Sequence, residues 1–227
     1  MRHLYMLPAA FLAPVIHEWV KALISTAQGD PAPRKHGYLT ANPLKYFEPI
    51  GFVFVLMFGF GWGRPVPTTA LHYRDRKRGV ILTYTIPVLV NLLLGVMAVM
   101  GVHMMAARLY GPLHYGAFFD FLFFQFRPPD LYHFSMFMLA HFAFININLA
   151  IFNIIPVYPL AANKLLITFS SPDNIARLNH YEKPMQILLI VLLAFGFGGL
   201  FDGTGILPRV LLPITHRIVG IAWGLFF

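Results

Sequence analysis

Apolar stretches long enough to cross a lipid bilayer recur along the whole chain, with short polar segments between them. The long stretches cover residues 4–27, 80–108, 131–155, 184–200 and 207–226. An α-helix needs about 20 mainly apolar residues to cross a hydrocarbon core of about 30 Å. We therefore predict an all-α polytopic membrane protein.

The composition agrees with this prediction. Hydrophobic residues make up 58% of the chain and charged residues 11%, with a mean hydropathy of +0.66. So few charged side chains could not cover the surface of a water-soluble fold. The 227 residues suffice for one compact helical bundle. We expect a single transmembrane domain over residues 1–227, with about five to six membrane helices and the lipid bilayer around it.

Two segments after the first apolar stretch do not fit an ordinary span. Residues 49–62 are apolar, but as a helix they would cover only about 20 Å. Residues 38–40, Tyr-Leu-Thr, lie in a polar region rich in proline and glycine and could form an edge strand. The sequence therefore predicts a short re-entrant or strand-containing segment after the first helix.

The positive charge indicates which partners to expect. The formal net charge is +8, and its densest cluster is residues 74–78, Arg-Asp-Arg-Lys-Arg. Short basic loops of membrane proteins stay on the cytoplasmic side, where they face anionic headgroups. We predict no nucleic-acid partner. The chain has no cysteine, which excludes disulfides and thiolate metal ligands.

A broken metal-binding pattern lies in the first apolar stretch. His17 and Glu18 begin the zinc-protease pattern H-E-x-x-H, but Lys21 stands where the second histidine belongs. Histidines at positions i and i+4 of a helix lie one turn apart, so both can reach one ion. A lysine ammonium has no lone pair to donate to a metal.

Several blocks, in the same order along nearly the whole chain, resemble the compact prokaryotic site-2 proteases, which are intramembrane zinc metalloproteases. Residues 37–44 resemble the family segment G-R-L-T-L-N-P-L, and residues 61–67 match G-W-x-x-P-V-P. Asn91 stands in the place of the asparagine of G-P-x-x-N, without the glycine. Residues 153–162 resemble N-x-x-P-x-x-P-L-D-G, with Ala161 in the place of the aspartate.

The resemblance implies a site-2-protease-like helical bundle in a prokaryotic cytoplasmic (inner) membrane, with a dismantled metal centre. Of the three family ligands, two histidines and an aspartate, only His17 remains. We predict no metal, no cofactor and no catalysis. The degenerate site comprises six residues: His17, Glu18, Lys21, Asn91, Asn153 and Ala161.

We also predict an ion pair between Glu18 and Lys21, which occupies the former metal site. The i, i+3 spacing places the two side chains on adjacent turns, and an unpaired charge in this helix would be costly. In the family site, the two positive charges of zinc are balanced by one aspartate and one glutamate. In this chain, the single positive charge of Lys21 is balanced by Glu18, so the site is neutral without a metal.

These residues also allow other interpretations. His17 and Glu18 could be adjacent by chance, and Lys21 could extend toward the membrane interface. His103 and His141 could form a shifted metal site with His17. Asn91 and Asn153 would serve helix packing through interhelical hydrogen bonds. The aromatic residues 118–126 would pack on lipid or on neighbouring helices.

The sequence is compatible with three functions. The first is an inactive homologue of the site-2 proteases, acting as a binding or accessory structural subunit in a larger complex with other integral membrane proteins. The second is an active intramembrane zinc metalloprotease with reassigned ligands such as His141. The third is a membrane protein that binds lipid or a small molecule in a cavity beside Glu18.

Overall fold

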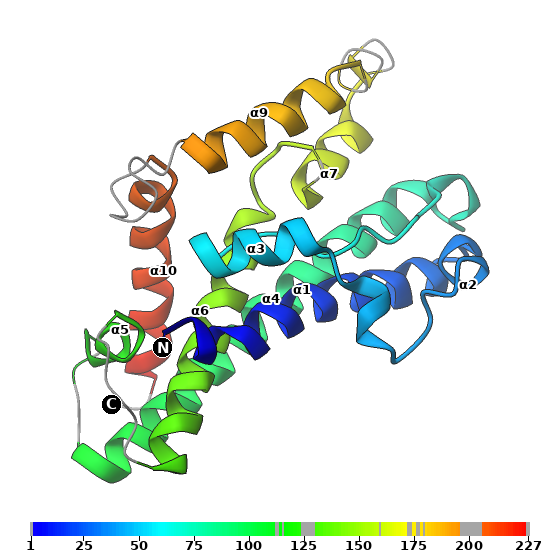
Figure 1. Ribbon diagram of the computed structural model, residues 1–227. Helices are drawn as coiled ribbons and strands as arrows, with labels where there is room; N and C mark the ends of the chain where they lie inside the picture. Colours follow the sequence, from blue (N-terminus) through cyan, green and yellow to red (C-terminus); the bar gives the residue numbers. More distant parts are fainter. Residues whose placement is uncertain are drawn as a thin grey trace.

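The computed structural model describes residues 2–111, 114, 116–123, 130–158, 160–171, 174–175, 178, 180–195 and 206–225. Throughout these residues the regular structure is helical, as predicted (Figure 1). The α-helices are α1 (Arg2–Ala27), α2 (Ala32–Lys35), α3 (Pro49–Phe58), α4 (Arg76–Tyr110), α5 (Gly116–Phe123), α6 (Leu131–Phe152), α7 (Ala161–Phe169), α9 (Glu182–Phe195) and α10 (Ile206–Gly224). Two 3-10 turns, η1 (Pro43–Tyr46) and η2 (Ala70–His72), lie in the connections.

Three of the described helices are long and apolar enough to cross a membrane: Met6–Ala27 within α1, and the whole of α4 and α6. The protein is therefore a membrane protein. α9 has 14 residues and measures about 21 Å, shorter than the hydrocarbon core. Residues 196–200, which complete its predicted span, lie outside the described residues. The total of five to six membrane helices stays a prediction.

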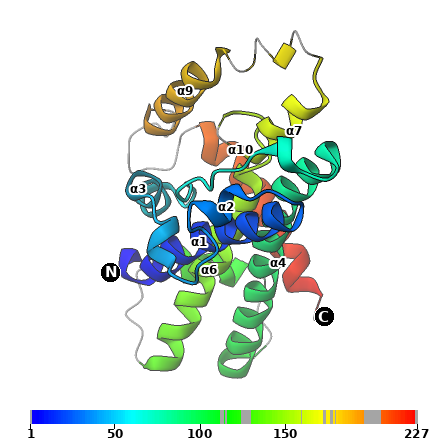
Figure 2. The same ribbon diagram turned by 90° about the vertical axis from the view of Figure 1, so that its right-hand side faces the viewer.

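α6 is the central element of the bundle. It packs against α1 and α4 (Figures 1 and 2), and it also contacts α5 and α10 (Figure 1). Every residue from Ala143 to Phe152 is buried, including the two polar residues Asn146 and Asn148. Gly95 of α4 allows a close approach, because a Cβ atom there would lie 2.6 Å from Ile147 of α6.

The segment between α1 and α4 doubles back on itself. α3 has ten residues and measures about 15 Å, too short to cross a bilayer. It ends at Gly59, whose φ of +79° suits glycine. The chain then returns along α3, and a Cβ at Gly51 would lie 2.0 Å from the Trp62 carbonyl oxygen. The short length is confirmed, whereas a re-entrant placement in the membrane stays a prediction.

The predicted edge strand at residues 38–40 is wrong. These residues are irregular, and no strand occurs in the part of the chain that the structure describes. The hydroxyl of Tyr46 donates to the carbonyl oxygens of Tyr38 and Thr40, and the amide of Tyr38 donates to the Pro33 carbonyl. Because a side chain and a turn satisfy these backbone groups, no neighbouring strand is needed.

Candidate functional site

The three polar residues of α1 are buried together. His17, Glu18 and Lys21 are 6%, 6% and 8% exposed. The Lys21 ammonium lies 2.7 Å from one carboxylate oxygen of Glu18 and donates to the other at 2.9 Å. The predicted ion pair is confirmed, and Lys21 does not extend toward the interface. Its Nζ also lies 5.6 Å from the centre of the Tyr84 ring in α4.

The loop between α3 and α4 supplies a further hydrogen bond to Glu18. The Val66 amide donates to the Glu18 oxygen Oε2 at 2.8 Å. The loop can come this close because residue 63 is a glycine. A Cβ there would lie 2.9 Å from the Pro14 carbonyl oxygen and 3.1 Å from Cγ of Glu18. The carboxylate thus has an ammonium and a backbone amide as partners, which offsets the cost of burying it.

A chain of side-chain hydrogen bonds holds His17 in place. His17 Nδ1 lies 2.8 Å from Oδ1 of Asn91, and the Asn91 amide donates to Oδ1 of Asn146 at 2.7 Å and to the Ala13 carbonyl at 3.3 Å. Because Oδ1 of Asn91 can only accept, His17 carries its proton on Nδ1 and its lone pair on Nε2. Asn91 therefore connects α1, α4 and α6, as expected from its predicted packing role.

Asn153 organises the turn between α6 and α7. Its side chain donates to the Leu149 carbonyl at 2.9 Å and accepts from the Ala161 amide at 3.4 Å. Its own carbonyl accepts from the Ala162 amide at 3.0 Å. These bonds join the two helices, as predicted for this asparagine, and they place Ala161 beside the α1 residues. Pro159, which belongs to the same motif, lies outside the described residues.

Five of the six predicted site residues line one small cavity, and Asn91 lies behind His17. The cavity is small, with about 30 Å³ open to the centres of water molecules. Its lining also includes residues that sequence reasoning did not assign to the site: Pro14, Trp62, Gly63, Pro65, Tyr84, Leu149 and Leu160. Trp62, Gly63 and Pro65 belong to the G-W-x-x-P-V-P block, which could have indicated them.

The residues of this cavity do not fit a zinc ion. Zinc in proteins takes three or four nitrogen, sulfur or oxygen ligands from side chains. Nε2 of His17 is available as a ligand, but the Glu18 carboxylate is bound by Lys21 and Val66, and Ala161 has no donor atom. Among the described residues, no group of three His, Cys, Asp or Glu side chains is placed to hold a metal.

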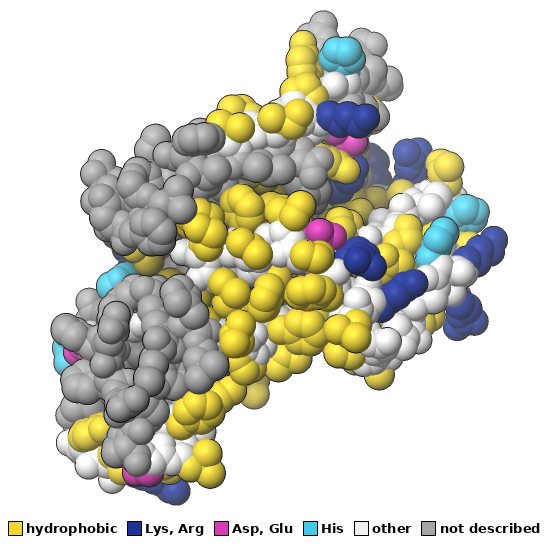
Figure 3. All heavy atoms as spheres, viewed as in Figure 1, with side chains coloured by type: hydrophobic (Ala, Val, Ile, Leu, Met, Phe, Trp, Pro, Cys, Tyr) yellow, Lys and Arg dark blue, Asp and Glu magenta, His cyan; other side chains and the backbone are white. Residues whose placement is uncertain are grey.

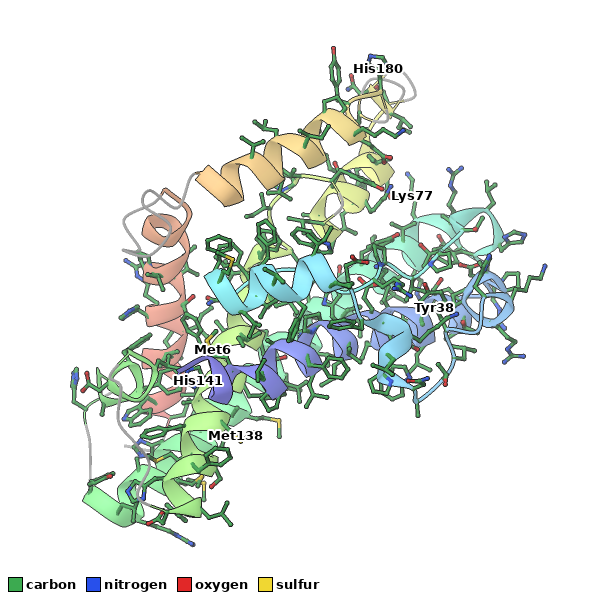
Figure 4. The ribbon with its side chains drawn as sticks, viewed as in Figure 1. Met6, Tyr38, Lys77, Met138, His141 and His180 are labelled. Atoms are coloured by element: carbon green, nitrogen blue, oxygen red, sulfur yellow. The ribbon has the colours of Figure 1, made fainter. Side chains whose placement is uncertain are left out.

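The two histidines considered for a shifted site lie elsewhere. His103 packs edge-on against Trp223 of α10, with ring centres 4.5 Å apart. Nδ1 of His141 lies 2.7 Å from the Phe137 carbonyl oxygen in the turn before it, so that nitrogen carries the proton (His141 is labelled in Figure 4). Neither side chain lines the cavity beside His17. The structure does not bring them together with His17.

The aromatic segment 118–126 is described in part. Phe118 and Phe119 are buried, and Phe118 packs edge-on against Trp223 at 6.3 Å between ring centres. This contact agrees with the predicted packing on a neighbouring helix. Residues 124–126 lie outside the described residues.

Comparison with known proteins gives one informative relative. A protein of Bacillus subtilis (strain 168) named "Putative zinc metalloprotease YwhC" is 29% identical over 195 residues, which cover 86% of this chain and 82% of the relative. No family model and no solved structure matches the chain. The relative agrees with the resemblance that the sequence blocks indicate: the chain resembles the site-2 protease-like family.

Proposed function

We propose that this site-2-protease-like membrane protein is catalytically silent and serves as a binding or accessory subunit of a membrane protein complex. One observation carries the proposal: the Lys21 ammonium is bonded to Glu18 inside the cavity where the family resemblance places a metal. A fixed cation repels a divalent ion at the same position. It also occupies the carboxylate that the zinc proteases use as a general base.

The opposite side of the cavity supports the same proposal. Ala161 lies where the resemblance places an aspartate ligand, and it is 5% exposed with no side-chain donor. The two replacements compensate each other in charge, because the added lysine cation balances Glu18 without a metal. Such a site remains neutral and satisfied in a low-dielectric interior, so the fold keeps its stability while the metal is dispensable.

The outer surface of α4 offers a place for a partner helix. Leu89, Leu93 and Met97 form a row at spacing i, i+4, i+8 and are 55%, 59% and 57% exposed. Within a membrane, such a row packs against lipid or against another helix. The inner cavity is too small for a helix, so the partner of an accessory subunit would contact this outer row.

An active intramembrane zinc metalloprotease is the competing function, and the name of the Bacillus relative favours it. Activity would require Lys21 to leave Glu18 and at least two further ligands to join His17. A metal measurement separates the two functions directly, because a working enzyme holds about one zinc per chain.

The test compares three forms of the full-length protein purified in mild detergent with zinc present: wild type, His17→Ala, and the ligand-restoring double variant Lys21→His with Ala161→Asp. We expect substoichiometric zinc in the wild type that His17→Ala does not change, and close to one zinc in the double variant. Stoichiometric zinc in the wild type, lost in His17→Ala, would refute the proposal. Zinc analysis by mass spectrometry reports the result.

The partner is tested by purification from the native membrane with crosslinking. We expect one membrane protein to co-purify with wild type and with Leu71→Ala, whose side chain is exposed outside the spans. The same protein should be lost from the double variant Leu89→Trp with Leu93→Trp, because bulky rings disrupt helix contact. Equal recovery from all three forms would exclude the α4 row as the contact.

A further inference from the structure

A second and larger cavity lies where the start of α4 meets α7 and the η2 segment. It measures about 430 Å³, within the range of small-molecule sites. It is separate from the cavity around His17, and Tyr84 lines both. Figure 4 labels Lys77 on the α4 side of this region, and Figures 1 and 2 both show α7 next to this end of α4.

The lining of this second cavity is strongly basic. Arg76 and Lys77 come from the first turn of α4, and Lys164 comes from α7. Lys164 is paired with Glu182 at 2.9 Å. The described lining residues include no carboxylate. With Glu182 counted, three positive charges face one negative charge, so the cavity favours an anion.

The remaining lining is mainly apolar. Val80, Ile167 and Ile175 bring apolar side chains, and the hydroxyls of Thr68 and Thr168 are already bonded to Tyr84 and to the Lys164 carbonyl. A small hydrophilic anion would gain nothing from such an apolar wall. A ligand with an anionic head and an apolar part matches both kinds of lining.

The hydroxyl of Tyr73 at the cavity is already engaged. It lies 3.0 Å from the Ser25 oxygen, which donates to Asp30, so Tyr73 is the donor of that pair. Burial raises the pKa of Tyr73, which therefore stays neutral. This tyrosine adds no negative charge that would oppose an anion.

The cavity lies at the basic end of α4, a helix long enough to reach the headgroup region. α4 has 35 residues and measures about 52 Å, so it extends well beyond a hydrocarbon core of about 30 Å. Its first turn, with Arg76 and Lys77 exposed, is the basic end of the helix. Lys and Arg gather at this end of the molecule, whereas apolar side chains cover the middle of the face in Figure 3.

We propose that the basic cavity between the start of α4 and α7 binds the phosphate-bearing headgroup of an anionic phospholipid. Arg76 and Lys77 neutralise the phosphate, Lys164 lies beside them in its pair with Glu182, and the apolar wall receives the upper part of an acyl chain. Basic pockets on the cytoplasmic side of membrane helices bind such headgroups in general. This inference is independent of the proposed function, because it uses none of the residues of the metal-site remnant.

The test is titration of the full-length protein, in uncharged detergent, with short-chain phosphatidylglycerol followed by native mass spectrometry. We expect saturable binding of one phosphatidylglycerol per chain, with phosphatidylcholine and inorganic phosphate binding at least about tenfold more weakly. Equal binding of phosphatidylcholine would refute recognition of the headgroup charge. Inorganic phosphate that displaces phosphatidylglycerol at equal concentration would assign the site to the free ion and refute the lipid.

Two variants locate the binding. Arg76→Gln with Lys77→Gln should weaken phosphatidylglycerol at least about tenfold, whereas the matched control Arg34→Gln with Lys35→Gln, two exposed bases on α2, should change it less than about twofold. Equal weakening in the control would indicate general surface attraction and refute the pocket. Thr168→Trp fills the cavity and keeps every charge, so unchanged binding in that variant would also refute it. If the arginine-lysine variant does not fold, Thr168→Trp decides alone.

Discussion

The buried site on α1 and the basic cavity at the start of α4 share Tyr84 as a wall, but their charges are arranged differently. In the buried site each formal charge has its counter-charge within 3 Å, and the cavity leaves only about 30 Å³ for the centres of water molecules. In the basic cavity Arg76 and Lys77 are exposed at the mouth of about 430 Å³ of open space. The first arrangement has its charges paired without a ligand, and the second is suited to receive one.

The largest expected effect is at the buried ion pair. Lys21→Ala leaves the Glu18 carboxylate buried with only the Val66 amide as partner, so we expect a loss of about 3–5 kcal/mol in the free energy of unfolding. Lys35→Ala, at an exposed lysine, should change it by less than about 0.5 kcal/mol. Unfolding titrations in detergent measure both. If the two variants lose a similar free energy of unfolding, the buried lysine matters no more to stability than an exposed one.

Asn91 should give the next largest effect. Asn91→Ala removes the partner of both His17 Nδ1 and Asn146 Oδ1 at fully buried positions, so we expect a loss of about 1–3 kcal/mol. Asn174→Ala, at an exposed asparagine, is the matched control and should have little effect. If Asn91→Ala leaves the free energy of unfolding unchanged, these side-chain hydrogen bonds add nothing to the packing of the three helices.

Replacing the whole ion pair should be nearly neutral. Glu18→Gln with Lys21→Met removes both charges and keeps an oxygen that can accept from the Val66 amide. Because burying two charges costs about as much as their attraction returns, we expect unfolding free energy within about 1 kcal/mol of wild type, or higher. A loss as large as that of Lys21→Ala would show that the pair itself stabilises the protein.

The smallest stability effect is expected at the basic cavity. Arg76→Gln with Lys77→Gln should change the free energy of unfolding by less than about 0.5 kcal/mol, because both side chains are exposed. The same variant should lose most of its phosphatidylglycerol binding. A large loss of stability would indicate that these residues hold the fold together and are not kept for a ligand.

The ion pair and the end of α1 were predictable because they depend on nearby residues. The i, i+3 spacing gave the Glu18 and Lys21 contact, and the apolar run to Ala27 gave the end of α1. The bond from Val66 to Glu18 joins residues 48 positions apart, and no local pattern indicates it. The strand at residues 38–40 was wrong for the same reason, because the Tyr46 hydroxyl that replaces a strand partner lies outside the segment.

The amide hydrogen of Val66 is a natural probe of the buried site. This amide is buried and bonded to Glu18. Solvent deuterium therefore reaches it only when the loop that carries Val66 lifts away from α1. Its exchange rate therefore records how often the interior opens, without any substitution in the protein. A partner protein that clamps the loop would slow that exchange.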